Sequence, residues 1–151
     1  MSQRPRLRSV CLFVMVVVCA ALPAQADAPE GQYIAGMEMV TDTKTGLIWQ
    51  QMQASATYDW SNAKNYCNNL NLNGFVWRLP TVKELLTLVD LGKENPSIDT
   101  SANGFPGTFP GLFWSATPVA SAPSYAWVIG FGFGYTDFDV MANMNRVRCV
   151  R

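Results

Sequence analysis

The order of patterns along the chain predicts an α+β fold, in which two helices are segregated from a mainly antiparallel sheet. Three observations carry this prediction. Apolar residues recur at helical spacing between residues 60 and 70, a helix-capping pattern begins at Thr81, and the chain after Leu112 is rich in aromatic and β-branched residues. A chain of 151 residues has the usual length of one domain and can bury a sizeable core.

A β-hairpin is expected before the first helix. Met37 to Val40 are predicted to form its first strand and Leu47 to Gln50 its second, because the intervening Asp42 to Gly46 has the composition of a turn. The segment 27–40 is therefore expected to contain a short polar entry and the first strand.

The first helix is predicted from about residue 60 to residue 70. Trp60, Ala63, Cys67 and Leu70 fall on one face of a helix with 3.6 residues per turn, and Asp59 is a suitable N-cap. The helix is expected to end in a stretch of asparagines and a glycine, namely Asn68, Asn69, Asn71, Asn73 and Gly74. Cys67 is therefore expected to face the core.

A second helix is predicted to begin after Thr81. The hydroxyl of Thr81 and the carboxylate of Glu84 have the spacing of a capping box, in which each side chain bonds the backbone N–H of the other residue. Gly92 is a suitable residue to follow the last turn. The apolar stripe of this helix is formed by Leu85, Leu88 and Val89.

The rest of the chain is predicted to be a long loop followed by strands. Residues 93–111 are rich in Gly, Pro, Ser and Asn, and loops of this length are often functional. The expected strands are 113–115, 125–131, 135–140 and 146–151, with a bend at 132–134 and a loop at 141–145. In the last strand, Val147 and Cys149 share one face, and Arg148 and Val150 share the other.

Residues 1–26 have the pattern of a secretory signal peptide. Three arginines precede an apolar run from Val10 to Leu22, and Ala24-Gln25-Ala26 supplies small residues at a cleavage site. The apolar run is shorter than the ~20 residues that a membrane span needs, although an uncleaved anchor stays an alternative. We therefore expect an exported protein in the periplasm, on the outer surface or outside the cell, with no membrane insertion after cleavage.

Charge and composition exclude several functions. The chain has 11 basic and 11 acidic residues and no histidine. Removal of the signal segment takes away three arginines and no acid, which changes the net charge from 0 to −3. A mildly acidic protein is a poor partner for nucleic acid. Without histidine, Ser-His-Asp and Cys-His catalysis and imidazole metal sites are excluded.

The two cysteines that remain after signal cleavage are Cys67 and Cys149. In an exported domain, a single pair of cysteines most simply forms one disulfide. This disulfide would close a span of 82 residues, from 67 to 149, and would stabilise the fold by about 4–5 kcal/mol. Two free thiols far apart are the alternative.

Six motifs in order resemble those of the Lcl C-terminal domain family, formerly a domain of unknown function. The resemblance covers about residues 41–151, apart from Val76 where the family often has Asp and Ala116 where it often has Ser. The motifs are Thr45–Gln50, Trp60–Ala63 with Tyr66-Cys67, Trp77–Thr81 with Glu84-Leu85, Phe113–Thr117, Ala126–Val128 and Val147–Arg151.

The resemblance implies a C-type-lectin-like fold, related to that of formylglycine-generating enzymes, with a disulfide between a helix and the last strand. The bacterial collagen-like adhesin that gives the family its name is implicated in binding sulfated polysaccharides through this domain. A shared fold does not by itself transfer that function.

Several motif residues are expected to be structural. The five tryptophans are expected in the core, because buried aromatic side chains dominate small cores. A buried arginine needs a carboxylate, which Glu84 or Asp90 could supply. The residues assigned a structural role are Trp77, Arg78, Leu79, Pro80, Thr81, Glu84 and Arg148.

The ligand-binding candidates lie in the long loop and the late strands. Aromatic residues there could form an exposed binding surface, although packing of the loop on its own domain is the alternative. An oxygen-rich cluster follows, in which Asp137 and Asp139 are weak candidates for calcium and a solvated hairpin face is the alternative. The candidates are Phe105, Phe109, Tyr135, Asp137, Phe138, Asp139, Asn143 and Asn145.

These observations favour an exported, non-catalytic binding module whose ligand is a polysaccharide or another cell-surface component. We expect no catalytic residues and no cofactor other than the weak calcium candidate. The alternative is an envelope module that binds another protein or has a structural role. An enzyme resembling formylglycine-generating enzymes comes third, because the cysteine pair is better explained as a disulfide.

Overall fold

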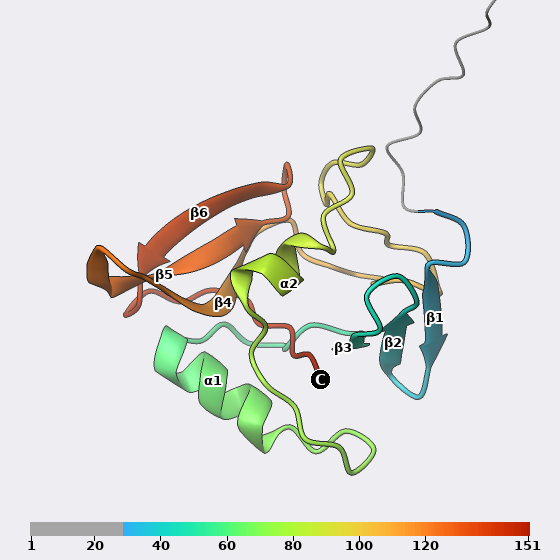
Figure 1. The fold of residues 1–151 in the computed structure, drawn as a ribbon, viewed down its shortest axis with the longest axis horizontal. Coiled ribbons are helices and arrows are strands. Elements are labelled where there is room, and N and C mark those ends of the chain that lie inside the picture. Colours follow the sequence, from blue (N-terminus) through green and yellow to red (C-terminus); the bar gives the residue numbers. More distant parts are fainter. Residues whose placement is uncertain (1–28) are drawn as a thin grey trace, which may run out of the picture.

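The computed structural model describes residues 29–151, and the predicted α+β class is confirmed (Figure 1). The predicted signal peptide, residues 1–26, lies outside the described residues. None of the helices in the described part of the chain has the length and apolar character that a membrane span requires. The elements are β1 (Tyr33–Gly36), β2 (Met39–Asp42), β3 (Ile48–Gln50), α1 (Trp60–Asn69), α2 (Val82–Leu86), β4 (Leu112–Val119), β5 (Ala122–Gly130) and β6 (Tyr135–Val140).

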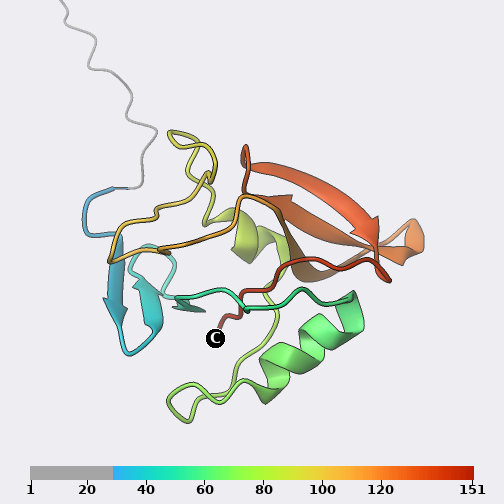
Figure 2. The ribbon, with the colours of Figure 1, turned by 180° about the vertical axis from the view of Figure 1, so that it is seen from behind.

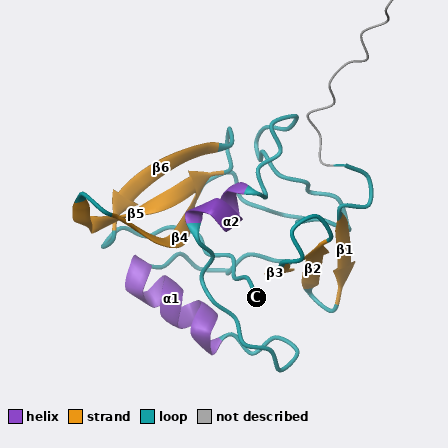
Figure 3. Cartoon of the chain, viewed as in Figure 1, coloured by secondary structure: helices purple, strands orange, loops and turns teal. Residues whose placement is uncertain are grey.

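The strands form two separate antiparallel sheets, where the sequence predicted one main sheet. The sheets have the orders β1-β2-β3 and β4-β5-β6, and they lie at opposite ends of the molecule in Figure 3. The prediction missed β1 and placed Met37 in a strand. Met37 and Glu38 instead form the tight turn between β1 and β2, with φ of 54° and 64°. Turns of this kind usually contain Asn or Gly, so the composition gave no signal.

Helix α1 agrees with its prediction. The Asp59 side chain caps it by accepting a hydrogen bond of 2.9 Å from the backbone N–H of Asn62. Ala63 and Cys67 are its buried residues, so the helix packs its small apolar face on the core. Contacts with β4 hold α1 against the C-terminal sheet.

Helix α2 begins as predicted but is shorter. The capping box between Thr81 and Glu84 is present, yet the helix ends at Leu86 and the prediction that it continues to Gly92 is wrong. Thr87 bonds the carbonyl oxygen of Glu84 through its hydroxyl, and the N–H of Leu88 bonds Leu85, so tighter turns replace the helix. Leu88 still reaches the core from these turns.

Residues 146–151 are extended but do not form the predicted strand. They make isolated bridges, in which Val150 pairs with both Trp49 and Arg78. Figure 2 shows this segment running beside residues 50–58 through the middle of the molecule. The predicted alternation is confirmed, because Val147 and Cys149 join one buried cluster and Val150 joins the other. The C-terminal segment therefore connects the two cores.

Candidate functional site

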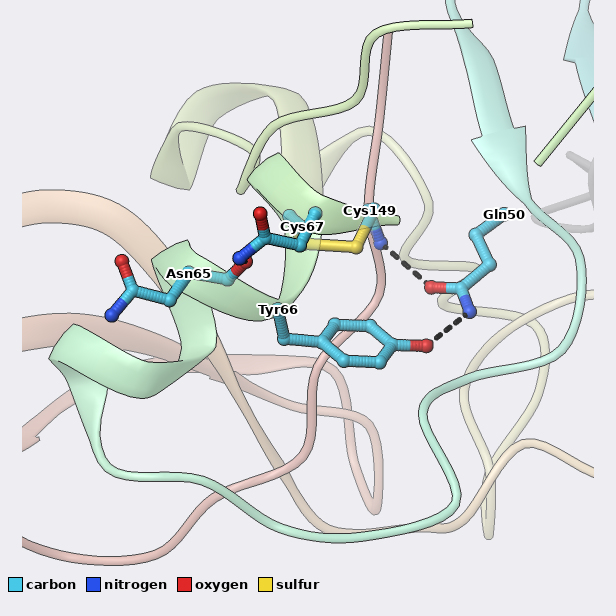
Figure 4. The surroundings of a disulfide bond; sticks show 6 residues. Gln50, Asn65, Tyr66, Cys67 and Cys149 are labelled. Carbon is cyan, nitrogen blue, oxygen red and sulfur yellow. Dashed lines mark hydrogen bonds between the residues drawn. A yellow bond between two sulfur atoms is a disulfide. The ribbon is translucent and has the colours of Figure 1, made fainter. Parts of the chain in front are cut away.

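The disulfide between Cys67 and Cys149 joins α1 to the C-terminal segment, as predicted (Figure 4). Both residues are fully buried, and their Cα atoms are 5.5 Å apart. The bond fixes one side of α1 against the core and leaves the opposite side to face solvent.

Tyr66, the neighbour of Cys67, is held in place by a short chain of hydrogen bonds. Its phenol oxygen accepts a 2.8 Å bond from Nε2 of Gln50, and Oε1 of Gln50 accepts a 3.2 Å bond from the N–H of Cys149 (Figure 4). Burial raises the pKa of the Tyr66 hydroxyl further above neutral pH, where a phenol is already protonated. It can therefore donate its own hydrogen to a ligand.

A groove of about 630 Å³ lies along the exposed side of α1. We call it the α1 groove. Asparagines and tyrosines provide most of its lining, namely Tyr58, Asn62, Asn65, Tyr66, Asn69 and Asn71. The other lining residues are Thr57, Leu70 and Met144, so no charged side chain lines it.

The lining combines rings with amide groups. The rings of Tyr58 and Tyr66 are stacked at a tilt, with centroids 5.1 Å apart. Asn69 donates through its side chain to the backbone carbonyl of Asn65, whereas the side-chain amides of Asn65 and Asn71 make no hydrogen bond within the described residues. The groove can therefore offer apolar ring faces together with amide donors and acceptors.

Sequence reasoning missed these residues because it treated Asn69 and Asn71 as helix-ending signals and gave Asn62 and Asn65 no binding role. Asn62, Asn65 and Asn69 recur at helical spacing on the side of α1 opposite Ala63 and Cys67. A polar stripe of one residue type beside a tyrosine was the signal that could have identified the groove.

Phe105 does not contribute to an exposed binding surface, and that prediction is wrong. Its side chain is fully buried, with its ring 5.1 Å from that of Tyr33 and 4.5 Å below the guanidinium of Arg148. Phe113, which follows the long loop in the sequence, is fully buried as well. The long loop packs on its own domain because Phe105 anchors it in the core.

The other aromatic candidates are exposed but lie on different surfaces. Phe138 packs edge-on against Trp127, its direct partner across β5 and β6. Tyr135, three residues earlier in the same strand, points to the other side of the sheet. The Phe109 ring instead lies 4.5 Å from the guanidinium of Arg146.

Asp137 and Asp139 bond neighbouring residues of their own chain. The N–H of Met141 donates to β5, so the N–H groups of Phe138 and Val140 point to the outer edge of β6. Asp137 accepts a 2.8 Å bond from the N–H of Phe138, and Asp139 accepts a 2.8 Å bond from the N–H of Val140. The acidic pair therefore caps the free edge of the sheet.

The other two members of the oxygen-rich cluster complete this arrangement. Asn143 and Asn145 donate through their side chains to Asp139, at 2.7 and 2.8 Å. Within residues 29–151, no three His, Cys, Asp or Glu side chains are grouped to hold a metal ion. Met144, between the two asparagines, lines the α1 groove, so this loop does reach it.

The two arginines of the structural motifs have different partners. Arg78 forms a two-pronged ion pair with Glu84, at 2.6 and 2.8 Å. The expectation that a buried arginine would find Glu84 or Asp90 is wrong for Arg148. Its side chain is fully buried, and the one hydrogen bond it makes among the described residues is a 2.9 Å bond to the hydroxyl of Thr108.

The remaining structural residues lie where the motif suggested. Trp77 and Leu79 are buried, and so is Pro80 between Leu79 and the α2 cap. Of the five tryptophans, Trp49, Trp77 and Trp114 are fully buried, whereas Trp60 and Trp127 are half-buried.

A second, smaller pocket of about 230 Å³ lies between α2 and the C-terminal sheet. It is lined by Val82, Lys83, Leu86, Trp127 and Thr136. Its lining is largely apolar, in contrast with the amide-rich α1 groove.

The model of the Lcl C-terminal domain family matches residues 38–151. The match spans strands β2 to β6, both helices and the disulfide, and leaves out β1; the chain belongs to this family. No curated protein matches the chain.

Proposed function

We propose that the protein is an exported, non-catalytic binding module that holds a glycan in the α1 groove. The observation that carries this proposal is the lining of the groove, which combines two tyrosine rings with four asparagine amides. Sugar rings present apolar C–H faces and hydroxyl groups, and these match aromatic faces and amide groups. The adhesin from which the family takes its name is implicated in polysaccharide binding.

The same lining supports a non-catalytic role. It contains no carboxylate, thiol or imidazole, which are the groups that acid–base and nucleophilic catalysis mostly use. We propose that binding needs no resident cofactor, and that the C-type-lectin-like fold implied by the family serves here without calcium.

We further propose that the protein reaches its site of action by secretion. The signal pattern of residues 1–26 supports this, and so does the disulfide, since disulfides persist in oxidising compartments. The expected partners are glycans of a cell surface, and nucleic acid is not among them.

A glycan array with the purified protein tests the proposal. We expect binding to a defined subset of glycans, unchanged by a calcium chelator. The variant Tyr58→Ala with Asn65→Ala should lose at least nine-tenths of this binding, because it removes one ring and one free amide from the groove. Asn68→Ala is the matched control, because Asn68 is exposed on α1 but does not line the groove.

Two outcomes would contradict the proposal. Equal losses in the groove variant and in Asn68→Ala would place glycan binding elsewhere on the molecule. Absence of binding to every glycan, together with specific capture of one envelope protein, would support the alternative role as a protein-interaction module.

A further inference from the structure

We infer that the α1 groove selects an uncharged glycan and discriminates against a sulfated one. This inference rests on the proposed function and narrows its ligand class. The ligand inferred here differs from the sulfated polysaccharides associated with the adhesin of the family, because the groove of this chain lacks the cationic groups that bind sulfate.

A sulfate group loses its hydration when it enters a groove, and this cost is recovered only if cations or several N–H donors replace the water. No lysine or arginine lines the α1 groove. Lys64 is on the same helix, but its ammonium lies 3.5 Å from the centroid of the Trp60 ring. The ammonium of Lys64, the lysine nearest to the groove residues in the sequence, therefore makes a cation–π contact with Trp60.

The described arginines are also engaged elsewhere. Each contacts either the Glu84 carboxylate or a phenylalanine ring, and the four are Arg78, Arg146, Arg148 and Arg151. Sulfated polysaccharides bind through clusters of cations, and the protein presents no such cluster at the groove.

An acidic residue bonded to one of the groove residues adds to this discrimination. Asp59 accepts hydrogen bonds from the backbone and side-chain N–H groups of Asn62, at 2.9 and 2.7 Å. These bonds lower the pKa of the Asp59 carboxyl, which therefore carries a full negative charge beside Asn62. A sulfate placed near Asn62 would be repelled.

The groups that remain suit neutral hydroxyls. The Tyr66 hydroxyl keeps its hydrogen as a donor, and the amides of Asn65 and Asn71 can each donate and accept. Such groups bind most favourably to a partner that both donates and accepts hydrogen bonds, as a sugar hydroxyl does. A sulfate oxygen only accepts, so it leaves the amide carbonyls unsatisfied.

Matched pairs of polysaccharides test this inference. The full protein is titrated with dextran, xylan and cellohexaose, and with the chemically sulfated form of each, at 50 and 500 mM NaCl. We expect at least one neutral member to bind at least tenfold more tightly than its sulfated form. Its Kd should change by less than twofold with salt, because no ion pairs are formed.

A gain of charge in the groove should reverse the preference. Asn65→Lys with Asn69→Lys is expected to raise the affinity for the sulfated form at least tenfold, in a salt-dependent manner, while Asn68→Lys outside the groove should not. Tighter and salt-sensitive binding of sulfated forms by the unmodified protein would overturn the inference and leave the proposed glycan function standing. If no member of any pair binds, the inference is overturned, and the glycan array then decides separately whether the proposed function stands.

Discussion

Arg148 shows how far a single residue can depart from its expected partner. Its guanidinium is fully buried without a carboxylate, and burial lowers its pKa to about 9. The rings of Phe105 and Phe113 lie 4.5 and 5.8 Å away, so cation–π contact and the bond to Thr108 replace an ion pair. Sequence spacing could not reveal this, because Phe105 and Thr108 come from a loop with no periodic pattern.

Glu84 carries a prediction about pH. The two-pronged bond from Arg78 lowers the pKa of Glu84 from its ordinary value of 4.5 to about 2. A lowered carboxyl pKa contributes stability above pH 4.5, and the contribution is lost as the pH falls through about 2. We expect Glu84→Gln to lower the free energy of unfolding by about 1 kcal/mol at pH 7.

Urea unfolding of both proteins between pH 7 and pH 2 checks this prediction. The difference in free energy should shrink between pH 4.5 and pH 2, because the natural protein then loses the same charge. A difference that stays constant down to pH 2 would contradict the assigned role of Glu84.

At the scale of elements, local signals predicted the starts of both helices and the strand β6 well. The cap of α1, the capping box of α2 and the span of β6 agree with the sequence patterns, since each depends on residues close together in the chain. The errors arose where distant contacts decide the structure. Residues 146–151 were expected to form a strand, but their partners on both sides give only isolated bridges.

The candidate site was missed for a different reason. Eight of the nine residues that line the α1 groove lie between Thr57 and Asn71, and Met144 alone comes from a distant segment, so the signal was local but was not interpreted as a binding surface. The candidate Phe138 is exposed as expected, but Phe105 is buried because Tyr33 and Arg148 surround it. Burial of this kind depends on tertiary packing and leaves no local pattern.

The edge of β6 carries a prediction about self-association. No strand of the described chain pairs with this edge, and Asp137 caps the outward N–H of Phe138. Exposed edge strands promote pairing between molecules. We expect Asp137→Ala to raise the self-association constant several-fold, while Asp137→Asn, which keeps an acceptor oxygen, should behave like the natural protein.

Sedimentation velocity over a range of protein concentrations measures this effect. An equal rise in self-association in both variants would show that charge repulsion, rather than capping of the edge, keeps the molecules apart, and no rise in either variant would show that Asp137 does not protect the edge.

At the scale of the whole molecule, the disulfide is expected to be a major source of stability. It closes a loop of 82 residues between α1 and the C-terminal segment. In the chain-entropy description, its removal costs about 4–5 kcal/mol. We expect Cys67→Ala with Cys149→Ala to lower the free energy of unfolding by this amount, as measured by urea denaturation.

Intact mass provides an independent check on the same bond. The protein should be two hydrogens lighter than its reduced form, and its two bonded cysteines should not react with a thiol-alkylating reagent. Two alkylatable thiols in the native protein, or an unchanged free energy in the double variant, would contradict this prediction.

The central position of the C-terminal segment determines the order in which the molecule can assemble. Val147, Cys149 and Val150 fill both cores, and they follow every other core residue in the chain. A nascent chain therefore cannot complete either core until these residues have been synthesised. Under the secretion we propose, this late completion of the cores keeps the chain sufficiently unfolded to pass through a narrow translocation channel. Folding is then completed on the far side, where Cys67 and Cys149 can be oxidised together.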